Sequence, residues 1–512
     1  MSTITKRTLI TGALTLTIAN IVTRLIGFAY RIFMAGAIGP EGMGLFQLIM
    51  PIYSLAWAIS CSGITTTLSR LVAAEAAAGE FGNTRRLLRQ SLLITSGLAG
   101  ILTLVLLIFA DAIAVGILND GRIALSLRIL SGALVFMAAG SCIRGYFLGL
   151  QRAAIPAISQ VVEQLARMTV ILMLAGTFIP RGLEYAAAAA VVGIVAGEGI
   201  SFAYVYIAYK RHSGRLPYKR PLMTQNQATF AIMAMATPLT LNRISSSFLS
   251  TVENVLIPQR LQLWGYSAEE AMAVFGKVTG MAMPLIFFPS AVLTALSISL
   301  VPSISEALAT GKYLRVNTTV SKSIILTSVI AFGAGLIFVV FPYEIGQLVY
   351  NQDLGMYLLV LGLMCPFWYL NITFSGVLNG LGEQIFIFRN SLLASFINIA
   401  FTFFLVPYYG VWAFLVGWLV GLVIITIFDI ARIRKVTDVR MQPVRWFIKP
   451  GMAALAAGLV ANYAHNNFIA QLGELAGMVV SLGLLMGLYG GFVMLLGVVT
   501  MDDIKSIFGK SA

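Results

Sequence analysis

The chain has 512 residues, of which 59% are hydrophobic and only 11% are charged. An ordinary soluble domain carries about 25% charged residues, so this composition excludes a water-soluble globular protein, a disordered chain and a disulfide-rich secreted module. Apolar blocks of about 20 to 28 residues follow one another along nearly the whole chain, and each is long enough to cross a bilayer as a helix. We therefore expect an all-α integral membrane protein.

The apolar blocks predict about fourteen transmembrane helices. In chain order they cover residues 9–37, 44–74, 91–118, 123–148, 154–178, 184–208, 227–257, 271–301, 319–342, 354–379, 386–407, 410–431, 450–469 and 475–500. The first block follows Lys6 and Arg7 but lacks a small-residue cleavage pattern, so we interpret it as a retained span. Cys61, Cys142 and Cys365 lie inside apolar blocks and predict no disulfide framework.

The basic residues between the spans predict the orientation of the chain. Of 34 lysines and arginines, 24 lie on the side of the N-terminus and only Arg122, Arg181 and Arg260 lie on the opposite side. Basic loops stay in the cytoplasm, so we expect a multi-pass protein of the bacterial cytoplasmic membrane with both termini cytoplasmic. The net charge of +14 then favours anionic membrane lipids as partners and argues against nucleic acid.

An internal repeat predicts how the spans are grouped. A shift of about 232 residues aligns residues 91–96 with 323–328 and residues 79–81 with 311–313. Chance similarity between apolar segments is the alternative. The matching span order predicts two six-helix lobes related as a parallel pseudo-repeat, followed by a C-terminal helical hairpin and a cytoplasmic tail. These parts are residues 1–220, 221–440 and 441–512.

Ten ionisable residues lie well inside the predicted spans or at their ends. They are Arg24, Arg31, Arg70, Arg128, Arg167, Arg243, Lys277, Glu163, Glu198 and Glu253. A charge at the centre of a span costs roughly 3 kcal/mol on insertion scales, so such residues face a hydrated cavity or a partner rather than lipid. Their location is the most informative feature of the chain, although Arg128, within two turns of the outer end of its span, is interpreted as interfacial rather than functional.

The first two spans of each predicted lobe hold most of the cations. Arg24 and Arg31 share one helical face with Asn20, and Arg243 is followed at helical spacing by Glu253. Guanidinium groups bind phosphate oxygens in a bidentate manner, so a cleft between these spans favours a phosphate or pyrophosphate head. The predicted substrate-binding residues are Arg24, Arg31, Arg70, Arg243, Lys277, Asn20 and Glu253. For Arg70 and Lys277, snorkelling from span ends is an equal alternative.

The remaining interior charges favour a structural role. Glu163 and Arg167 are four residues apart on one span, and Glu198 reaches a similar depth on the next. An ion pair within the bundle is favoured over a proton relay. The chain has no P-loop and no HExxH or Cys-x-x-Cys motif, so we expect no metal, no cofactor and no enzymatic activity; a coupling ion, sodium or proton, is left open.

Five short stretches carry motifs of a known family. They are residues 23–31 (TRLIGFAYR), 39–47 (GPEGMGLFQ), 51–53 (PIY), 144–151 (RGYFLGLQ) and 159–164 (SQVVEQ). These stretches resemble the stage V sporulation protein B family, which belongs to the multidrug/oligosaccharidyl-lipid/polysaccharide exporter superfamily beside the bacterial lipid II flippases. The resemblance implies two six-helix lobes, a terminal hairpin and alternating access.

The resemblance also implies a cargo and its contacts. In the flippase relatives, arginines of the first span and of the lobe interface contact the pyrophosphate; Arg24 matches the first-span arginine, and Arg243 is assigned by position alone. Arg31 departs from the family pattern because a tyrosine extends the run before it and Ile32 stands where relatives commonly have an acid. We expect a flippase for an undecaprenyl-pyrophosphate-linked saccharide, lipid II for spore cortex or cell wall, with cell-wall synthesis enzymes as further partners.

Two other functions are weighed against the flippase. A proton- or sodium-coupled multidrug exporter of the same superfamily would use Glu253 or Glu198 as its ion site. It predicts an acidic or aromatic cleft, which is opposite in sign to the cations counted here. A membrane scaffold for a sporulation or division complex is the third, and buried arginines argue against it.

Overall fold

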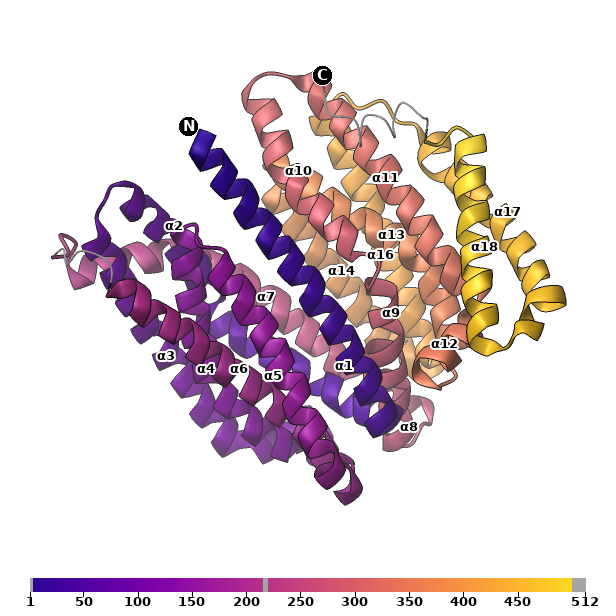
Figure 1. Cartoon of the computed structure of the whole chain (residues 1–512). Helices are drawn as coiled ribbons and strands as arrows, with labels where there is room; N and C mark the ends of the chain where they lie inside the picture. The colour runs from indigo at the N-terminus through magenta and orange to yellow at the C-terminus, as the bar shows by residue number, and fades with distance from the viewer. Residues whose placement is uncertain (1–2, 215–219, 500–512) are drawn as a thin grey trace. The chain divides into compact units, whose positions relative to one another are not determined.

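The computed structural model describes residues 3–214 and 220–499, and within these ranges it contains helices and turns and no strand (Figure 1). Thirteen helices of the described part are long and apolar enough to cross a membrane. The predicted all-α membrane fold is therefore confirmed. Contacts between Cα atoms divide the chain into two compact units, Met1–Gly276 and Lys277–Ala512.

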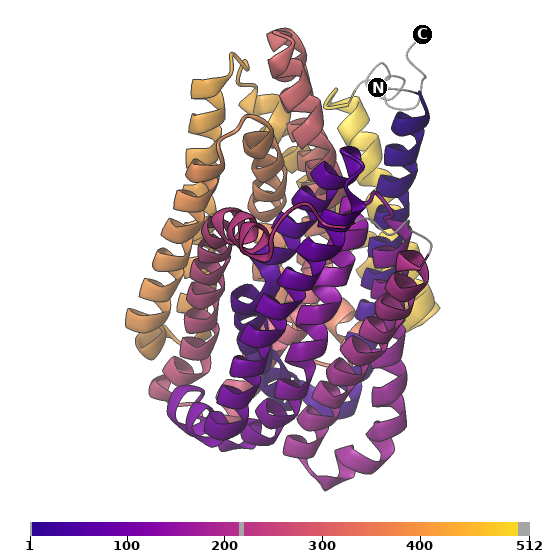
Figure 2. The same cartoon turned by 90° about the vertical axis from the view of Figure 1, so that its left-hand side faces the viewer.

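Unit 1 is a bundle of long helices that run side by side (Figures 1 and 2). Within it, α3 packs on α4, and α6 packs on both α4 and α5. The helices are α1 (Thr3–Trp57), α2 (Gly63–Ala77), α3 (Phe81–Ala112), α4 (Ala124–Gly149), α5 (Ala154–Phe178), α6 (Leu183–Ser213), α7 (Gln225–Trp264) and α8 (Ala268–Phe275).

The first two predicted spans are nearly continuous, and a break in α1 separates them. Gly39 has φ 66° and ψ −176°, a conformation that L side chains rarely adopt, and Pro40 follows it. Beyond the break, a Cβ on Gly44 would lie 2.1 Å from the Met272 carbonyl oxygen, so only glycine lets α8 lie against α1. The second predicted span then continues through a π-helical turn at Ala58–Ser62 into α2.

Helix α7 differs from the other long helices of unit 1. Its ends are packed, with Ile232 and Leu261 fully buried, whereas the residues from 237 to 250 are exposed or half-buried. It is absent from the thirteen apolar helices because its middle is polar, reading TPLTLNRISSSFLS. A helix with a polar, accessible middle is disfavoured in lipid and is expected to line a hydrated space.

A set of side chains on α3 holds the segment that connects α6 to α7. Arg85 Nη2 donates to the Ser213 carbonyl oxygen at 2.7 Å, and Arg86 Nη1 donates to the Met223 carbonyl oxygen at 2.5 Å. Asn83 Oδ1 accepts from the Met223 amide at 3.0 Å. Both ends of this connection are therefore fastened to unit 1.

Unit 2 contains the remaining helices, and the eighth predicted span is divided among α8, a π-helical segment at Gly276–Ala282, α9 and α10. Helix α17 packs on α18 and on α11, as expected for a terminal hairpin. The helices are α9 (Met283–Phe287), α10 (Ala291–Ala309), α11 (Tyr313–Val340), α12 (Pro342–Tyr350), α13 (Gly355–Gly380), α14 (Gln384–Phe404), α15 (Val406–Tyr409), α16 (Val411–Val436), α17 (Lys449–Ala464) and α18 (Glu474–Leu495).

The contact boundary and the repeat boundary fall at different places. Contacts divide the chain after Gly276, so α7 has its contacts in unit 1. The repeat predicts a boundary at residue 220, and the lobe ranges drawn from it stay a prediction. Residues 500–512 of the predicted cytoplasmic tail lie outside the described part of the chain.

Candidate functional site

The predicted substrate-binding residues of α1 lie on an accessible part of the helix. Asn20 and Arg24 are exposed, and Arg31 is half-buried. On this stretch α1 approaches α5 closely, since a Cβ on Gly27 would lie 3.2 Å from Gln164 Nε2. The two arginines therefore lie on a helix that packs against α5 near Gly27.

Arg243 lies on the stretch of α7 whose side chains are exposed or half-buried. Ala236, Thr240 and Arg243 follow i, i+4, i+7 spacing and share one face. Ala236 is buried, and a Cβ on Gly63 of α2 would lie only 2.1 Å from Thr240 Oγ1. Arg243 itself is exposed. The face that is tightly packed at Thr240 is thus open one turn later, at the guanidinium group.

The other predicted substrate-binding residues are more dispersed. Arg70 is exposed on α2, and Glu253 is half-buried on α7. Lys277 is half-buried at the start of unit 2. Six of the seven predicted residues belong to unit 1, on α1, α2 and α7, and Lys277 belongs to the other unit. Their role in substrate binding stays a prediction.

The predicted ion pair of α5 has the expected geometry. Arg167 Nη2 lies 2.9 Å from Glu163 Oε1, and both side chains are 18% exposed. Helix α6 packs closely on this pair because it presents glycines to it. A Cβ on Gly193 would lie 3.1 Å from the Arg167 carbonyl oxygen, and one on Gly197 would lie 2.9 Å from that of Glu163.

Glu198 of α6 has partners that the sequence analysis does not name. The Tyr53 hydroxyl donates to Glu198 Oε1 at 2.5 Å, and Arg144 Nη2 lies 4.0 Å from Glu198 Oε2. Glu198 is 4% exposed. Burial of a carboxylate is tolerated where a hydrogen bond and a cation compensate for lost water. A tyrosine in an apolar run carries no charge, so only the PIY motif pointed to it.

Arg144, one of the 24 basic residues counted on the N-terminal side, has its side chain inside the unit 1 bundle. It lies within α4, five residues before the helix ends at Gly149, and its side chain is 15% exposed. Its guanidinium group donates to Ser141 Oγ at 3.0 Å and to Ser201 Oγ at 3.2 Å. These two hydroxyls and Glu198 supply the guanidinium group with partners inside the bundle, and this explains why a charged side chain is tolerated there.

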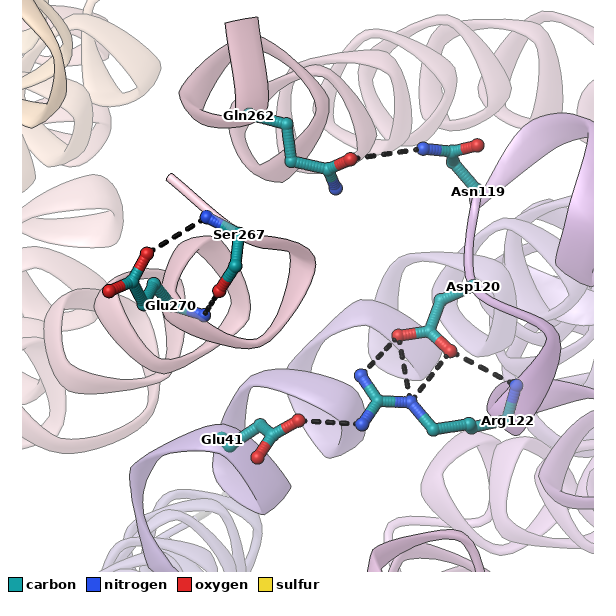
Figure 3. A network of polar contacts seen from close by, with 7 residues as sticks. All are labelled: Glu41, Asn119, Asp120, Arg122, Gln262, Ser267 and Glu270. Atoms are coloured by element: carbon teal, nitrogen blue, oxygen red, sulfur yellow. Dashed lines mark hydrogen bonds and ion pairs between the residues drawn. The ribbon is translucent and has the colours of Figure 1, made fainter. Parts of the chain in front are cut away.

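A second polar network joins the far ends of several unit 1 helices (Figure 3). The Arg122 guanidinium group contacts Glu41 at 2.6 Å and Asp120 at 2.7 Å. In the same loop, Asn119 Nδ2 donates to Gln262 Oε1 of α7 at 3.4 Å. The network therefore connects α1 just after its break, the loop before α4 and the end of α7.

An acid that the sequence analysis missed lies in unit 2. Asp429 of α16 is 3% exposed. It accepts hydrogen bonds from Asn390 Nδ2 at 2.8 Å and from Asn371 Nδ2 at 3.3 Å. It lies near the end of the twelfth predicted span, 410–431. The two amides satisfy the buried carboxylate, so Asp429 joins α16 to α13 and α14 through hydrogen bonds.

Among the described residues, no group of three or more His, Cys, Asp or Glu is arranged to hold a metal ion.

Comparisons with known proteins match most of the chain. Residues 9–308 match the family model described as polysaccharide biosynthesis protein, and residues 238–404 match that described as MatE. Stage V sporulation protein B of Bacillus subtilis (strain 168) is 30% identical over 445 residues, which covers 85% of this chain and 86% of that protein. Lipid II flippase MurJ of the same organism is 24% identical, covering 62% of this chain and 61% of that protein.

Solved structures share the fold at lower identity. Lipid II flippase MurJ in an inward closed conformation has a TM-score of 0.74 at 13% identity, covering 94% of this chain and 98% of that chain. An inward-facing multidrug resistance MATE family transporter of the MOP superfamily has a TM-score of 0.66 at 15% identity, covering 81% and 95%.

Proposed function

Because this chain belongs to the polysaccharide biosynthesis protein family and to that of stage V sporulation protein B, we propose that it is a flippase. Its proposed cargo is an undecaprenyl-pyrophosphate-linked saccharide, with lipid II for spore cortex or cell wall as the first candidate. The proposed mechanism is alternating access across the cytoplasmic membrane. This is a transport function rather than an enzymatic one.

The observation that carries the proposal is the accessible, polar middle of α7 with Arg243 at its centre. A membrane helix gains nothing from an exposed guanidinium group unless water or an anion meets it. Arg24, exposed on α1 of the same unit, adds a second such group. Guanidinium groups pair with phosphate oxygens in a bidentate manner, so a pyrophosphate head is a suitable anion.

The remaining residues take supporting roles in this proposal. Asn20 and Arg31 extend the polar face of α1, and Arg70 and Lys277 add cations for the same head group. Glu253 supplies the single anion of the set, which would interact with an amine or hydroxyl of the cargo. Both termini are proposed to be cytoplasmic, with anionic lipids and cell-wall synthesis enzymes as further partners.

The test is head-group translocation in proteoliposomes loaded with a labelled lipid II. Replacing Arg24 and Arg243 together by Ala removes two charge-assisted hydrogen-bonding groups, each contributing about 1.5–3 kcal/mol. We expect translocation to fall at least about a hundredfold while the protein remains folded. Arg128→Ala is the matched control, because that arginine pairs with an exposed partner, Asp111. Wild-type rates in the double variant would remove the mechanism.

A second candidate is a cation-coupled exporter of amphipathic compounds, favoured by the MatE match over residues 238–404. It requires an acidic ion site, for which Glu253 or buried Glu198 would serve. Drug efflux that depends on Glu253 and is indifferent to Arg24 and Arg243 would favour this candidate. The predicted substrate-binding set, with five cations and one acid, favours the flippase.

A further inference from the structure

An open cavity lies at the surface of unit 2. It has a volume of about 490 Å³, which is within the range of small-molecule sites. It lies beyond the C-terminal end of α11, between α12, the loop before α13, and the turn that joins α17 to α18. Its lining combines apolar side chains, an aromatic ring and three carboxylates.

The acidic part of the lining comes from three separate segments. Glu344 lies on α12, Asp353 lies in the loop before α13, and Glu474 begins α18. Among the described residues that line the cavity, none is a lysine or an arginine. This is the reverse of the chain as a whole, which has 34 basic and 20 acidic residues. The cavity therefore attracts cations in a protein that otherwise attracts anions.

Local structure explains where the carboxylates lie but does not cancel their charge. Glu344 and Glu474 are in the first turns of their helices, and Asp353 Oδ1 accepts from the Gly355 amide at 3.2 Å. A helix N-terminus carries only about half a positive charge. Two such ends do not neutralise three full negative charges, so the rim of the cavity stays anionic.

The remaining lining suits an apolar body with a positive head. Met478 forms a buried wall at 3% exposed, and the half-exposed ring of Tyr343 offers an aromatic face for a cation–π contact. His465 is held in place by a 2.7 Å hydrogen bond between Nδ1 and Ser481 Oγ. Leu475 and Val479, exposed by 66% and 63%, continue an apolar surface along α18.

We propose that this cavity binds an amphiphile whose head is a substituted ammonium group and whose apolar chain lies along α18. It lies at the end of α11 opposite to Lys312 and Arg315, which the charge distribution predicts to be the outer end. The ligand is therefore recruited at the outer head-group level of the membrane. The inference stands apart from the proposed flippase function, because it uses no residue of the predicted substrate-binding set.

The test measures calorimetric binding of decyltrimethylammonium to the full-length protein in nanodiscs of neutral lipid, with empty nanodiscs subtracted. We expect saturable binding of one molecule per chain. Replacing the three acids together, by Glu344→Gln, Asp353→Asn and Glu474→Gln, should weaken it at least about tenfold. Met478→Trp, which fills the cavity and keeps every charge, should weaken it similarly. Glu306→Gln, at an exposed acid of α10, is the matched control and should bind as the wild type does.

Three results would overturn the proposal. The first is wild-type affinity in both the triple-acid variant and the Met478 variant. The second is equal saturable binding of decanol, which has the same chain and no charge. The third is loss of binding in the Arg24→Ala, Arg243→Ala double variant, which would assign the bound cation to unit 1. That double variant should lose head-group translocation and keep cation binding, so the two proposals fail separately.

Discussion

The hydrogen bond between Tyr53 and Glu198 should be a principal link between α1 and α6. Tyr53→Phe removes the hydroxyl that donates to Glu198 Oε1 at 2.5 Å and leaves the ring in place. The carboxylate, which is 4% exposed, then keeps Arg144 at 4.0 Å as its ion-pair partner. We expect the free energy of unfolding to decrease.

Two magnitudes bracket the expected effect. Hydrogen bonds to charged groups contribute about 1.5–3 kcal/mol in soluble proteins, whereas those between transmembrane helices average about 0.6 and reach about 1.7 kcal/mol. The acceptor here is a buried carboxylate and the distance is short, so we expect a coupling free energy of about 1.5 kcal/mol. Glu198→Leu removes the acceptor without offering another, which completes a double-mutant cycle.

The assay is equilibrium unfolding of the four proteins of the cycle in mixed detergent micelles. Tyr185→Phe, at a tyrosine of α6 that is 40% exposed, is the control and should change stability by less than about 0.5 kcal/mol. A coupling free energy below about 0.5 kcal/mol between positions 53 and 198 would refute the reasoning. Head-group translocation measured on the same variants should fall no further than the loss of folded protein if Glu198 is structural.

Three further predictions concern stability. Arg122→Ala removes contacts to two acids and should destabilise unit 1 by about 1–2 kcal/mol. Arg128→Ala should cost less than about 1 kcal/mol, because its ion pair with Asp111 is exposed. Equal losses of stability in chemical unfolding would contradict this prediction. Gly44→Ala should lower the free energy of unfolding by about 1–3 kcal/mol, because its Cβ would meet a backbone oxygen of α8. The control is Gly36→Ala on the same helix, whose Cβ meets nothing within 4 Å. In thermal unfolding it should be neutral or stabilising. Asp429→Ala leaves two asparagine amides without their acceptor and should cost about 1–3 kcal/mol, with Asn at the same position less harmful; an unchanged melting temperature for Ala would exclude the buried network.

Periodicity and charge placement predicted much of the fold because they act locally. The i, i+4 spacing of Glu163 and Arg167 was enough to anticipate a contact within one helix. The unusual position of Arg243 inside the predicted span 227–257 was readable as well, since a charge at that depth is rare in a membrane helix.

Long-range partners could not be predicted in the same way. Tyr53 and Glu198 are 145 residues apart, and no local pattern links them. Arg144 and its partner Ser201 are 57 residues apart, and again no local pattern links them. Asp429 was overlooked for a related reason, since a single acid near a span end resembles an interfacial charge until two facing amides are known.

The attachment of α7 to unit 1 has a practical consequence for dividing the protein into halves. A fragment ending at residue 220 would lack Thr240 and would bare the surface around Gly63 of α2, although Arg85 and Arg86 would still be present to hold the incoming connection. Co-expression of two pieces cut in the turn between α7 and α8 keeps that surface covered. Complementation between separately produced pieces should therefore succeed with the later cut and fail, through aggregation of the shorter piece, with the earlier one.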